Sequence, residues 1–395
     1  MGQSRSGKHK YKPATKLAQV GEAIPKKGSI QKNNAIGYFG GLDILRFICA
    51  LGVVFHHEAE TLLKHRIISG NANSMEYVGA FCVNTFFIIS GFLISFILMK
   101  EFKNNSFSLK NFYMRRIIRI WPLYFLTVFV MIFLIPLING MDWSIIKSNL
   151  LYAATFTVNF QLLLNAISKT YVVLWSVCIE EHIYLLLPLL LFLFKGKFKS
   201  LAAFLIGTGL FSWIYFLHVQ SKSDYLATYF VSSSYFYYFG IGTLIACMYN
   251  RNDTERKAEK YIFNPIVQVV MMLVFFPYVL NLWGSHGFPT PLFFYALFGG
   301  YLVWAATQPS FIFKLKPIYS RYLGNISYGL YLVHIWVVVT TFKMLKHTGV
   351  GITFWKTIFP CIALLASVGI ATLLYYSFEK PILKLKAKFT TVASK

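Results

Sequence analysis

Charged residues are scarce in this sequence. They make up 13% of its 395 residues, whereas about 25% of the residues of a soluble globular domain are charged. Acidic residues are the scarcest, with 14 Asp and Glu against 38 Lys and Arg, which gives a formal net charge of +24. Hydrophobic residues make up 56% of the chain and aromatic residues 18%. This composition excludes disordered, collagen-like and coiled-coil chains and favours a membrane protein.

Cysteine chemistry also has little support. The five cysteines are isolated from one another, and each lies inside an apolar run: Cys49, Cys82, Cys178, Cys247 and Cys361. No two of them have the spacing of a metal-binding pair such as C-x-x-C. We therefore expect no disulfide framework, no metal site and no bound cofactor. A cysteine in such a run behaves as a small apolar residue.

Signals for secretion and for nucleotide chemistry are missing as well. Residues 1–34 contain eight bases and one acid but lack the apolar stretch of a signal peptide. We expect residues 1–35 to form a basic, disordered cytoplasmic tail. The Walker, G-x-S-x-G, H-E-x-x-H and G-x-G-x-x-G patterns are absent, so nucleotide hydrolysis and zinc proteolysis have no motif support.

Long apolar runs, by contrast, are abundant. A helix needs about 20 apolar residues to cross the hydrocarbon of a bilayer. Ten stretches meet this requirement: 36–58, 77–99, 120–139, 175–194, 200–219, 229–249, 264–283, 290–307, 323–342 and 354–378. The sequence therefore predicts an all-α, polytopic membrane protein with about ten transmembrane helices.

The distribution of bases predicts the orientation of these helices. With the N-terminus in the cytoplasm, 29 of the 38 bases fall in cytoplasmic segments and eight on the other side, with Arg46 inside the first span. This asymmetry places both termini in the cytoplasm, and it explains the basic clusters better than nucleic-acid binding does. We expect one membrane domain over 36–383, followed by a basic cytoplasmic tail, 384–395.

An eleventh apolar stretch, 148–164, is short and interrupted by polar residues such as Asn149 and Asn159. If it crossed the membrane, every later loop would change sides and the base asymmetry would be lost. We therefore expect it to be a re-entrant or interfacial segment within an extracytoplasmic loop, 140–174.

Ionisable residues inside the predicted spans are candidate functional groups, because burying them in a membrane is costly. In the first span, Asp43 and Arg46 are three residues apart and can pair on one helix face. Arg46 and His57 share a face about 16 Å apart along the axis, whereas His56 lies about 80° away from that face. A purely structural Asp–Arg pair with interfacial histidines is the alternative.

Three arginines, Arg115, Arg116 and Arg119, lie at the cytoplasmic mouth of the third span. They are expected as topology markers in any such loop. Planar guanidinium groups also bind phosphates in a bidentate manner. Arg116 and Arg119 are about one turn apart, so both can face one phosphate-rich cytosolic ligand.

Two adjacent carboxylates, Glu180 and Glu181, lie about 8–10 Å below the outer end of the fourth span, between Trp175 and Tyr184. Neighbouring helical residues point about 100° apart, so only one of the two is expected to face a given ligand. A carboxylate at this depth needs a cationic or hydrogen-bonding partner. Because His57 ends the first span at a similar height, a Glu180–His57 pair is geometrically feasible.

The last candidates lie near the C-terminus. Tyr331 and His334 belong to the ninth span, and Glu379 closes the tenth. A lone histidine in the middle of a span is more often a hydrogen-bonding residue between helices than a catalyst. Glu379 has an equally simple alternative as a surface partner of Lys380 or Lys384.

The ordered set of these motifs, from about residue 39 to 383, resembles the acyltransferase 3 family of integral membrane acyltransferases. The sequence departs from the family pattern at Cys178 and His182. The segments that carry the resemblance are Leu42-Asp43 with Arg46 and His57 (R-x10-H), Ser90-Gly91-Phe92-Leu93-Ile94, Arg115-Arg116-Ile117-Ile118-Arg119-Ile120-Trp121-Pro122, Trp175-Ser176 through Glu180-Glu181-His182-Ile183-Tyr184, Ser327-Tyr328 with Tyr331-Leu332-Val333-His334, and Phe378-Glu379-Lys380-Pro381.

The resemblance implies a ten-helix domain in the bacterial inner membrane that moves an acyl group, usually acetyl, from cytosolic acyl-CoA to a hydroxyl on an extracytoplasmic glycan or glycolipid. O-antigen and other surface polysaccharides are typical acceptors. The implied partners are acyl-CoA as co-substrate, the acceptor and the lipid bilayer, without nucleic acid. Which acceptor and which acyl group are used stays open at this point.

A mechanism follows from the residue types. Arg115, Arg116 and Arg119 would bind the CoA phosphates, and His57 would act as general base on the acceptor hydroxyl. Glu180 would orient His57, and Arg46 would stabilise the thioester carbonyl. A covalent acyl-His57 relay is equally compatible. Asp43, Trp175, Glu181, Tyr184, Tyr331, His334 and Glu379 are expected to support the site.

The alternative from another functional class is a secondary transporter. In that case the intramembrane Asp43, Arg46 and Glu180 would bind a substrate or relay protons. Many transporters are built from internal repeats, and the sequence has none that we detect. Acyl-CoA turnover by the purified protein would distinguish the enzyme from the transporter, which would instead give counterflow in liposomes.

Overall fold

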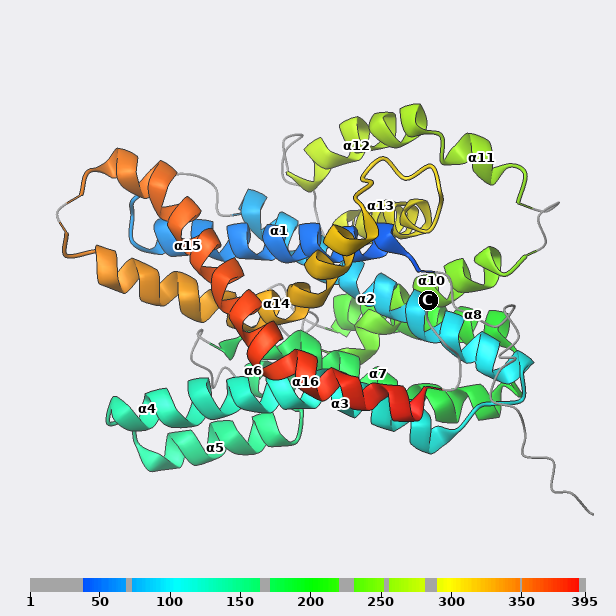
Figure 1. Cartoon of the computed structure of the whole chain (residues 1–395), viewed down its shortest axis with the longest axis horizontal. Helices are drawn as coiled ribbons and strands as arrows, with labels where there is room; N and C mark the ends of the chain where they lie inside the picture. The colour runs from blue at the N-terminus through cyan, green and yellow to red at the C-terminus, as the bar shows by residue number, and fades with distance from the viewer. Residues whose placement is uncertain are drawn as a thin grey trace, which may run out of the picture.

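The computed structural model describes residues 38–68, 73–163, 171–219, 231–251, 256–280, 290–348 and 350–390, and every regular element in these ranges is helical. The predicted tail 1–35 and part of the predicted outer loop, residues 164–170, lie outside the described residues. Figure 1 shows the helices packed against one another in a single bundle. The prediction of an all-α chain is confirmed.

Seven helical stretches in the described part of the chain are long and apolar enough to cross a membrane. Two shorter apolar helices accompany them, α12 (Pro265–Val279) and α13 (Thr290–Ala306). The protein is therefore a polytopic membrane protein. The seven long stretches are α1 (Gly40–Lys64), α2 (Asn73–Lys103), α3 (Leu109–Val128) with its continuations η2 (Phe129–Leu134) and α4 (Ile135–Ile138), α7 (Leu174–Leu193), α8 (Phe198–Val219), α14 (Pro317–Leu345) and α15 (Ile352–Leu374) with the elements that follow it.

The expectation of ten long spans is only partly confirmed. The stretch predicted at 229–249 contains a 3₁₀ turn, η4 (Ser232–Tyr235), and α10 (Phe236–Tyr249), which has only 14 residues. A helix of that length spans about 21 Å, less than the roughly 30 Å of a hydrocarbon core. Apolar composition alone overestimated the helix length there, because it does not reveal where a helix begins.

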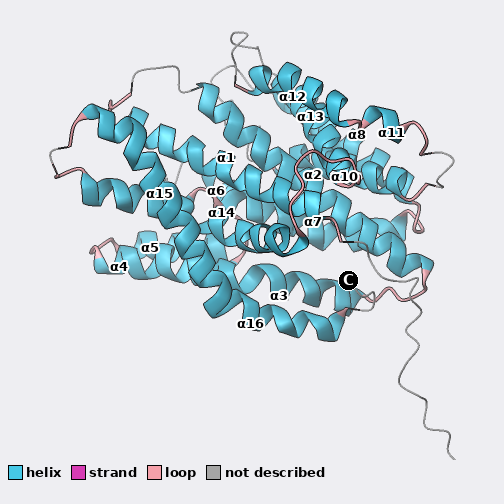
Figure 2. Cartoon of the chain, turned by 45° about the horizontal axis from the view of Figure 1, so that its top comes forward, coloured by secondary structure: helices cyan, strands magenta, loops and turns pink. Residues whose placement is uncertain are grey.

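The stretch 148–164 forms two short helices, α5 (Trp143–Ala154) and α6 (Val158–Leu163), separated by a turn. In Figures 1 and 2, α5 runs back alongside α4, and it also contacts η2. The Asp142 carboxylate caps the start of α5 by accepting hydrogen bonds from the Ser144 hydroxyl and from the Ser144 backbone N–H, the latter at 2.7 Å. Both bonds stabilise the ionised carboxylate and so lower the pKa of Asp142. Whether this segment is re-entrant or interfacial stays a prediction from the sequence.

The centre of the bundle is α2, which α10 crosses at very short range. A Cβ atom on Gly91 would lie 2.4 Å from the Phe239 carbonyl oxygen, and one on Gly242 would lie 2.2 Å from the Ile88 carbonyl oxygen. Only glycine allows the two backbones to approach this closely. Gly91 belongs to the S-G-F-L-I motif, so one role of that motif is to allow α10 to pack closely against α2.

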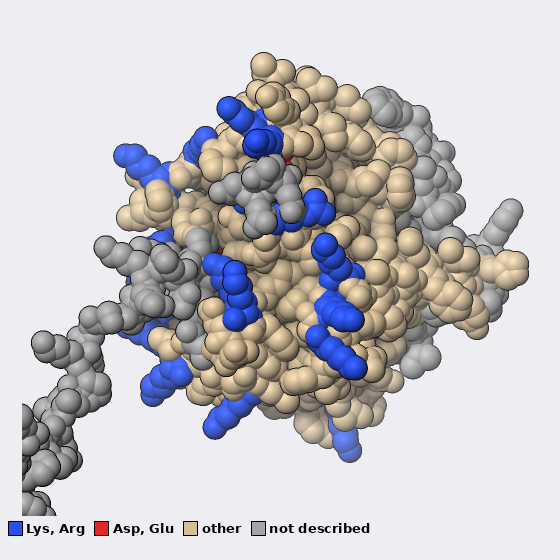
Figure 3. Space-filling model, turned by 90° about the vertical axis from the view of Figure 1, so that its right-hand side faces the viewer, with Lys and Arg blue, Asp and Glu red and all other residues tan. Residues whose placement is uncertain are grey.

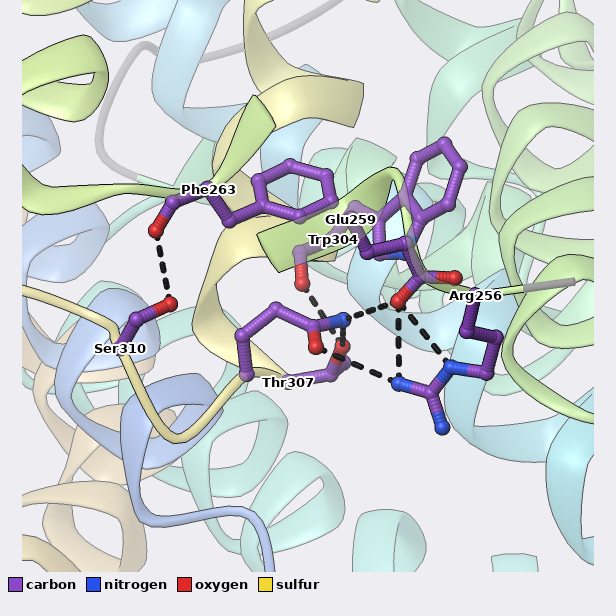
Figure 4. Close-up of polar contacts among 7 residues, drawn as sticks. Arg256, Glu259, Phe263, Trp304, Thr307 and Ser310 are labelled. Carbon is purple, nitrogen blue, oxygen red and sulfur yellow. Dashed lines mark hydrogen bonds and ion pairs between the residues drawn. The ribbon is translucent and has the colours of Figure 1, made fainter. Parts of the chain in front are cut away.

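A second contact region lies beside α11 (Glu259–Ile262). Arg256 donates to Glu259 at 3.0 and 3.1 Å, and Gln308, in the link between α13 and α14, donates to the same carboxylate at 3.1 Å. The Ser310 hydroxyl donates to the Phe263 carbonyl at 2.7 Å (Figure 4). Burial lowers the pKa of Arg256, but the hydrogen bonds and charge interactions with Glu259 and Tyr249 together outweigh burial, so the pKa is raised. These contacts hold α11 against the α13–α14 link.

The C-terminal elements follow α15 without a break: η5 (Tyr375–Glu379), α16 (Lys380–Leu383) and η6 (Lys384–Phe389). Both α16 and η6 contact α3, as Figure 2 shows for α16. Residues 384–389 of the predicted basic tail are therefore a 3₁₀ helix packed on the bundle.

Basic side chains gather on one end of the molecule. Figure 3 views the right-hand side of Figure 1, where Lys and Arg side chains surround a region of uncharged surface and almost no acidic side chain is visible. This end also carries the end of the described chain (Figure 1). It is the end that the positive-inside rule predicts to be cytoplasmic.

Candidate functional site

A cavity of about 90 Å³ lies among α1, α2, α3, α7 and α14. It brings together six of the polar residues that the sequence analysis selected, Arg46, Arg116, Arg119, Glu180, Tyr184 and Tyr331, and aromatic and aliphatic residues complete its wall. Its polar lining residues are Arg46, Ser90, Arg116, Arg119, Ser176, Glu180, Tyr184, Ser327, Tyr328 and Tyr331. A pocket with a mostly apolar wall and a few convergent polar groups is typical of a ligand site.

Glu180 is the acid of this cavity. Its Oε1 accepts hydrogen bonds from the Ser90 hydroxyl on α2 and from the Tyr184 hydroxyl one turn further along α7. Electrostatic attraction also links Glu180 to Arg46 on α1. Ser90 precedes Gly91, so the close crossing of α2 and α10 also fixes the position of this hydroxyl. Glu180 is therefore anchored inside the cavity by groups from two helices and attracted to a third.

The three arginines of α3 divide into two environments. Arg115 is buried, forms an ion pair with the buried Glu101 at 2.9 Å, and donates to the Phe389 carbonyl at 2.9 Å. Arg116 and Arg119 line the cavity instead. The Arg116 guanidinium lies 5.6 Å from the Tyr184 ring centroid, and its Nε has no hydrogen-bond partner within the described part of the chain. Only two of the three predicted donor-binding arginines therefore face the cavity.

A fourth cation, Lys386 of η6, lies near this group. It is half-buried and close enough to Arg116, Arg119 and Arg46 to experience electrostatic repulsion from each of them. Glu101 does not neutralise this group, because it is paired with Arg115. Asp43, Glu180 and Glu379 each attract arginines of the group. An excess of positive charge at one end of a cavity suits an anionic ligand.

His57 lies outside the cavity lining, in the C-terminal part of α1. Its Nδ1–H donates to Glu60 Oε2 at 3.0 Å, and its ring centroid lies 5.2 Å from that of His334. The suggested hydrogen bond between His57 and Glu180 is therefore not formed among the described residues. The reason is local: Glu60 is three residues away on the same helix, whereas Glu180 is held by Ser90 and Tyr184.

His334 connects the cavity wall to His57. It is completely buried, and its Nδ1–H donates to the Tyr331 carbonyl at 2.7 Å, while Nε2 finds no hydrogen-bond partner among the residues that the structure describes. Tyr331 lines the cavity, and its hydroxyl shares a hydrogen bond of 2.6 Å with Ser176. The path from the cavity to His57 therefore passes Tyr331 and His334.

The remaining predicted residues surround this core. Asp43 packs against the backbone of Gly324, since a Cβ there would lie 2.4 Å from its carboxyl carbon, and it attracts Arg46 and Arg119. Trp175 is buried, and its ring centroid lies 5.3 Å from that of Tyr235.

Glu181 and Glu379 lie on other sides of the core. The Trp121 indole N–H donates to Glu181 at 3.4 Å, so Glu180 and Glu181 do point in different directions. Buried Glu379 lies beside Gly329 and is attracted to Arg119, away from the surface lysines.

Sequence reasoning missed three residues, Ser90 as a partner of Glu180, Glu60 as a partner of His57, and Lys386. Glu60 had a detectable signal, because an acid three residues after a histidine on a helix can reach it. Ser90 was part of a recognised motif but had no assigned role. Lys386 gave no local signal, because its position depends on how η6 packs against α3.

Comparisons with known proteins identify the family of the chain. The profile of the acyltransferase 3 family, described as an acyltransferase domain, matches residues 39–376. The chain is 25% identical over 369 residues to the peptidoglycan O-acetyltransferase OatA of Listeria monocytogenes, covering 88% of this chain and 56% of that protein. It is 25% identical over 339 residues to the putative O-acetyltransferase SACOL0978 of Staphylococcus aureus, covering 79% of this chain and 53% of that protein.

An uncharacterised protein of Haemophilus influenzae is 30% identical over 220 residues, covering 49% of this chain and 84% of that protein. The chain thus spans about half the length of the listerial and staphylococcal relatives. No solved structure is a significant match.

Proposed function

The chain belongs to the acyltransferase 3 family of membrane enzymes, and we propose that it transfers an acetyl group from cytosolic acetyl-CoA to a hydroxyl of an extracytoplasmic glycan. The observation that carries the proposal is the composition of the cavity. Arg116 and Arg119 line it, Glu180 and Arg46 lie within it, and Tyr331 leads from it to His57. This arrangement offers an anion site for the donor and a general base for the acceptor.

The donor enters from the basic end. The CoA phosphates bind Arg116 and Arg119, whose planar forks suit phosphate oxygens. Arg115 is excluded from this role because Glu101 and the Phe389 carbonyl occupy its guanidinium. The slender pantetheine arm then follows the cavity along α7 from Tyr184 toward Ser176, carrying the thioester to the outer end of the cavity.

His57 is the base in this proposal. Because Nδ1–H donates to Glu60, the neutral ring keeps its lone pair on Nε2. Nε2 takes the proton of the acceptor hydroxyl as its oxygen bonds to the thioester carbon. The C–S bond then breaks, and the proton passes from His57 to the departing CoA thiolate. Glu60 takes over the orienting role first assigned to Glu180, as the carboxylate does in a hydrolase triad.

Arg46 acts on the donor in this scheme. About 16 Å of helix axis separates it from His57, too far for both groups to act on one carbon atom. We therefore assign Arg46, together with Glu180, to holding the donor within the cavity. The hydrogen-bonded pair of Ser176 and Tyr331 supplies hydroxyl groups near the expected position of the thioester carbonyl.

The proposed topology has ten crossings with both termini in the cytoplasm, the short helices α10, α12 and α13 completing the seven long ones. His57 then lies toward the extracytoplasmic side, where a polymer acceptor is available. The name of the listerial relative specifies peptidoglycan, so peptidoglycan fragments are the first acceptors to test, followed by other surface glycans.

The direct test is transfer of isotopically labelled acetyl from acetyl-CoA to such fragments by the purified full chain in nanodiscs. His57→Ala should lower the rate about 10² to 10⁴-fold, the usual loss for a general base. His56→Ala is the matched control and should retain most of the activity, because the His56 ring packs beside Gly79 of α2, whereas the His57 ring is the one that lies 5.2 Å from His334. Normal activity of His57→Ala, with both variants at normal membrane levels, would refute the assignment.

A further inference from the structure

A cluster of potential metal ligands lies at the outer end of α1. His56, His57 and Glu60 place one ligand atom each within 4.8 Å of one another. His56 and Glu60 are four residues apart, which puts them on one face of the helix with His57 beside them. Cysteine spacing could not reveal this group, because it contains no cysteine.

The distances in the cluster are close to those of a metal site. Zinc binds imidazole nitrogen and carboxylate oxygen at about 2.0–2.2 Å, so tetrahedral ligand atoms lie about 3.4 Å apart. His57 Nδ1 and Glu60 Oε2 are already 3.0 Å apart. Side-chain rotation of roughly an ångström brings the third ligand atom to the tetrahedral separation.

His334 provides an independent observation that points to the same ligand. Its Nε2 is completely buried without a hydrogen-bond partner, while its Nδ1–H donates to the Tyr331 carbonyl. A metal-binding histidine typically has this arrangement, with one nitrogen donating to a carbonyl and the other free to bind the ion. The His334 ring centroid lies 5.2 Å from that of His57, so a further nitrogen donor is available beside the cluster.

The ligand types in the cluster determine which metal ion it prefers. Imidazole nitrogens with one carboxylate suit zinc and neighbouring transition metals, whereas calcium and magnesium prefer oxygen ligands alone. The Glu60 side chain is 45% exposed and that of His57 15%, so an ion can reach the cluster through Glu60.

We propose that His56, His57 and Glu60 bind Zn²⁺ and that bound zinc stops acyl transfer. The ion takes the lone pair of His57 Nδ1, and the ring proton that Nδ1 donated to Glu60 Oε2 moves through solvent to Nε2, so the ring stays neutral. A neutral imidazole has a single lone pair, so a ring that binds zinc through either nitrogen has none left to accept the proton of a hydroxyl. The inhibitory part rests on the proposed role of His57 as base, whereas the binding part does not.

Metal binding is tested on the full chain, purified in detergent with an affinity tag that contains no histidine. We expect one zinc per chain by elemental analysis, and with Co²⁺ as a spectroscopic probe the visible absorption of a tetrahedral site. His56→Ala should weaken binding at least about tenfold. His347→Ala, which removes an exposed histidine after α14, is the control and should bind as the unmodified chain does. Substoichiometric binding, or equal affinity in both variants, would overturn the site.

Activity measurements separate this inference from the proposed function. Zinc at the binding concentration should inhibit acetyl transfer by the unmodified chain and by His347→Ala, and a chelator should restore the rate. His56→Ala should remain active at the same zinc concentration. Full activity of zinc-loaded protein would overturn the inhibitory role. If the chain binds zinc through His56 but transfers no acetyl group without the metal, the proposed function fails while the site stands.

Discussion

Arg115 and Arg116 are consecutive residues of α3, yet Arg115 is buried in an ion pair with Glu101 while Arg116 lines the cavity and stacks over Tyr184. The difference arises because neighbouring helical residues point about 100° apart. One basic motif therefore combines a structural anchor with a candidate ligand-binding group, and substitutions should separate the two roles.

Arg115→Ala should lower the stability of the fold, because it leaves the Glu101 carboxylate buried without its partner. The loss of one partner of a buried ion pair costs about 3–5 kcal/mol. Arg116→Ala and Arg119→Ala should instead raise the KM for acetyl-CoA at normal protein levels, and lysine at these positions should restore binding only in part. Thermal unfolding in detergent and steady-state kinetics measure the two effects. Equal behaviour of Arg115→Ala and Arg116→Ala in both assays would contradict the division.

Lys386 should contribute to donor binding although it lies ten residues beyond the family match. Lys386→Gln removes a charge near Arg116 and Arg119, so the KM for acetyl-CoA should rise while kcat changes little. Lys388→Gln is the matched control, because Lys388 is an exposed lysine of the same η6 helix. The effect should shrink at high ionic strength, where charge interactions are screened. A KM that responds equally to both substitutions would exclude a specific role.

Glu60 and Glu180 should differ in which kinetic constant they control. Glu60→Ala removes the acceptor of His57 Nδ1–H, so kcat should fall by about tenfold or more with little change in the KM for acetyl-CoA. Glu180→Gln keeps the shape of the side chain but removes the charge that attracts Arg46, so the KM for acetyl-CoA should change. The opposite pattern would restore the original assignment of Glu180 to His57.

The orientation in the membrane can be tested with introduced cysteines. In a background without the native cysteines, Lys346→Cys after α14 should react with a membrane-impermeant maleimide in intact, outer-membrane-permeabilised cells. Lys197→Cys, between α7 and α8, should react only after lysis, because the base distribution places it in the cytoplasm. Both lysines are exposed, so access through the protein does not distinguish them. A reversed labelling pattern would refute the proposed topology.

The sequence predicted the helical class and the residues of the cavity better than their interactions. Helix periodicity correctly separated Glu180 from Glu181, because the angle between neighbours is a property of one helix. The similar predicted depths of Glu180 and His57 in the membrane also suggested that these two residues are partners. Helix periodicity could not show that Ser90 reaches Glu180 first, because that contact depends on the packing of α2 against α7 and α10.

The length of α10 and the packing of residues 384–389 also could not be predicted from the sequence. The predicted span 229–249 has the composition of a membrane helix, yet its regular helix begins only at Phe236. Residues 384–389 have the composition of a solvated tail, yet they form a 3₁₀ helix that places Lys386 near four arginines. In both cases tertiary packing decides the structure.

The close crossing of α2 and α10 determines which wall of the cavity can move. Backbone contact at Gly91 and Gly242 leaves these two helices no room to slide together, and α2 is hydrogen-bonded to α7 through Ser90 and Glu180. The other walls of the cavity come from α1, α3 and α14, and α14 carries both Tyr331 and His334. A displacement of α14 that widens the cavity for the donor therefore also changes the spacing between His334 and His57. The helix motion that admits the donor would then also change the surroundings of the base, His57.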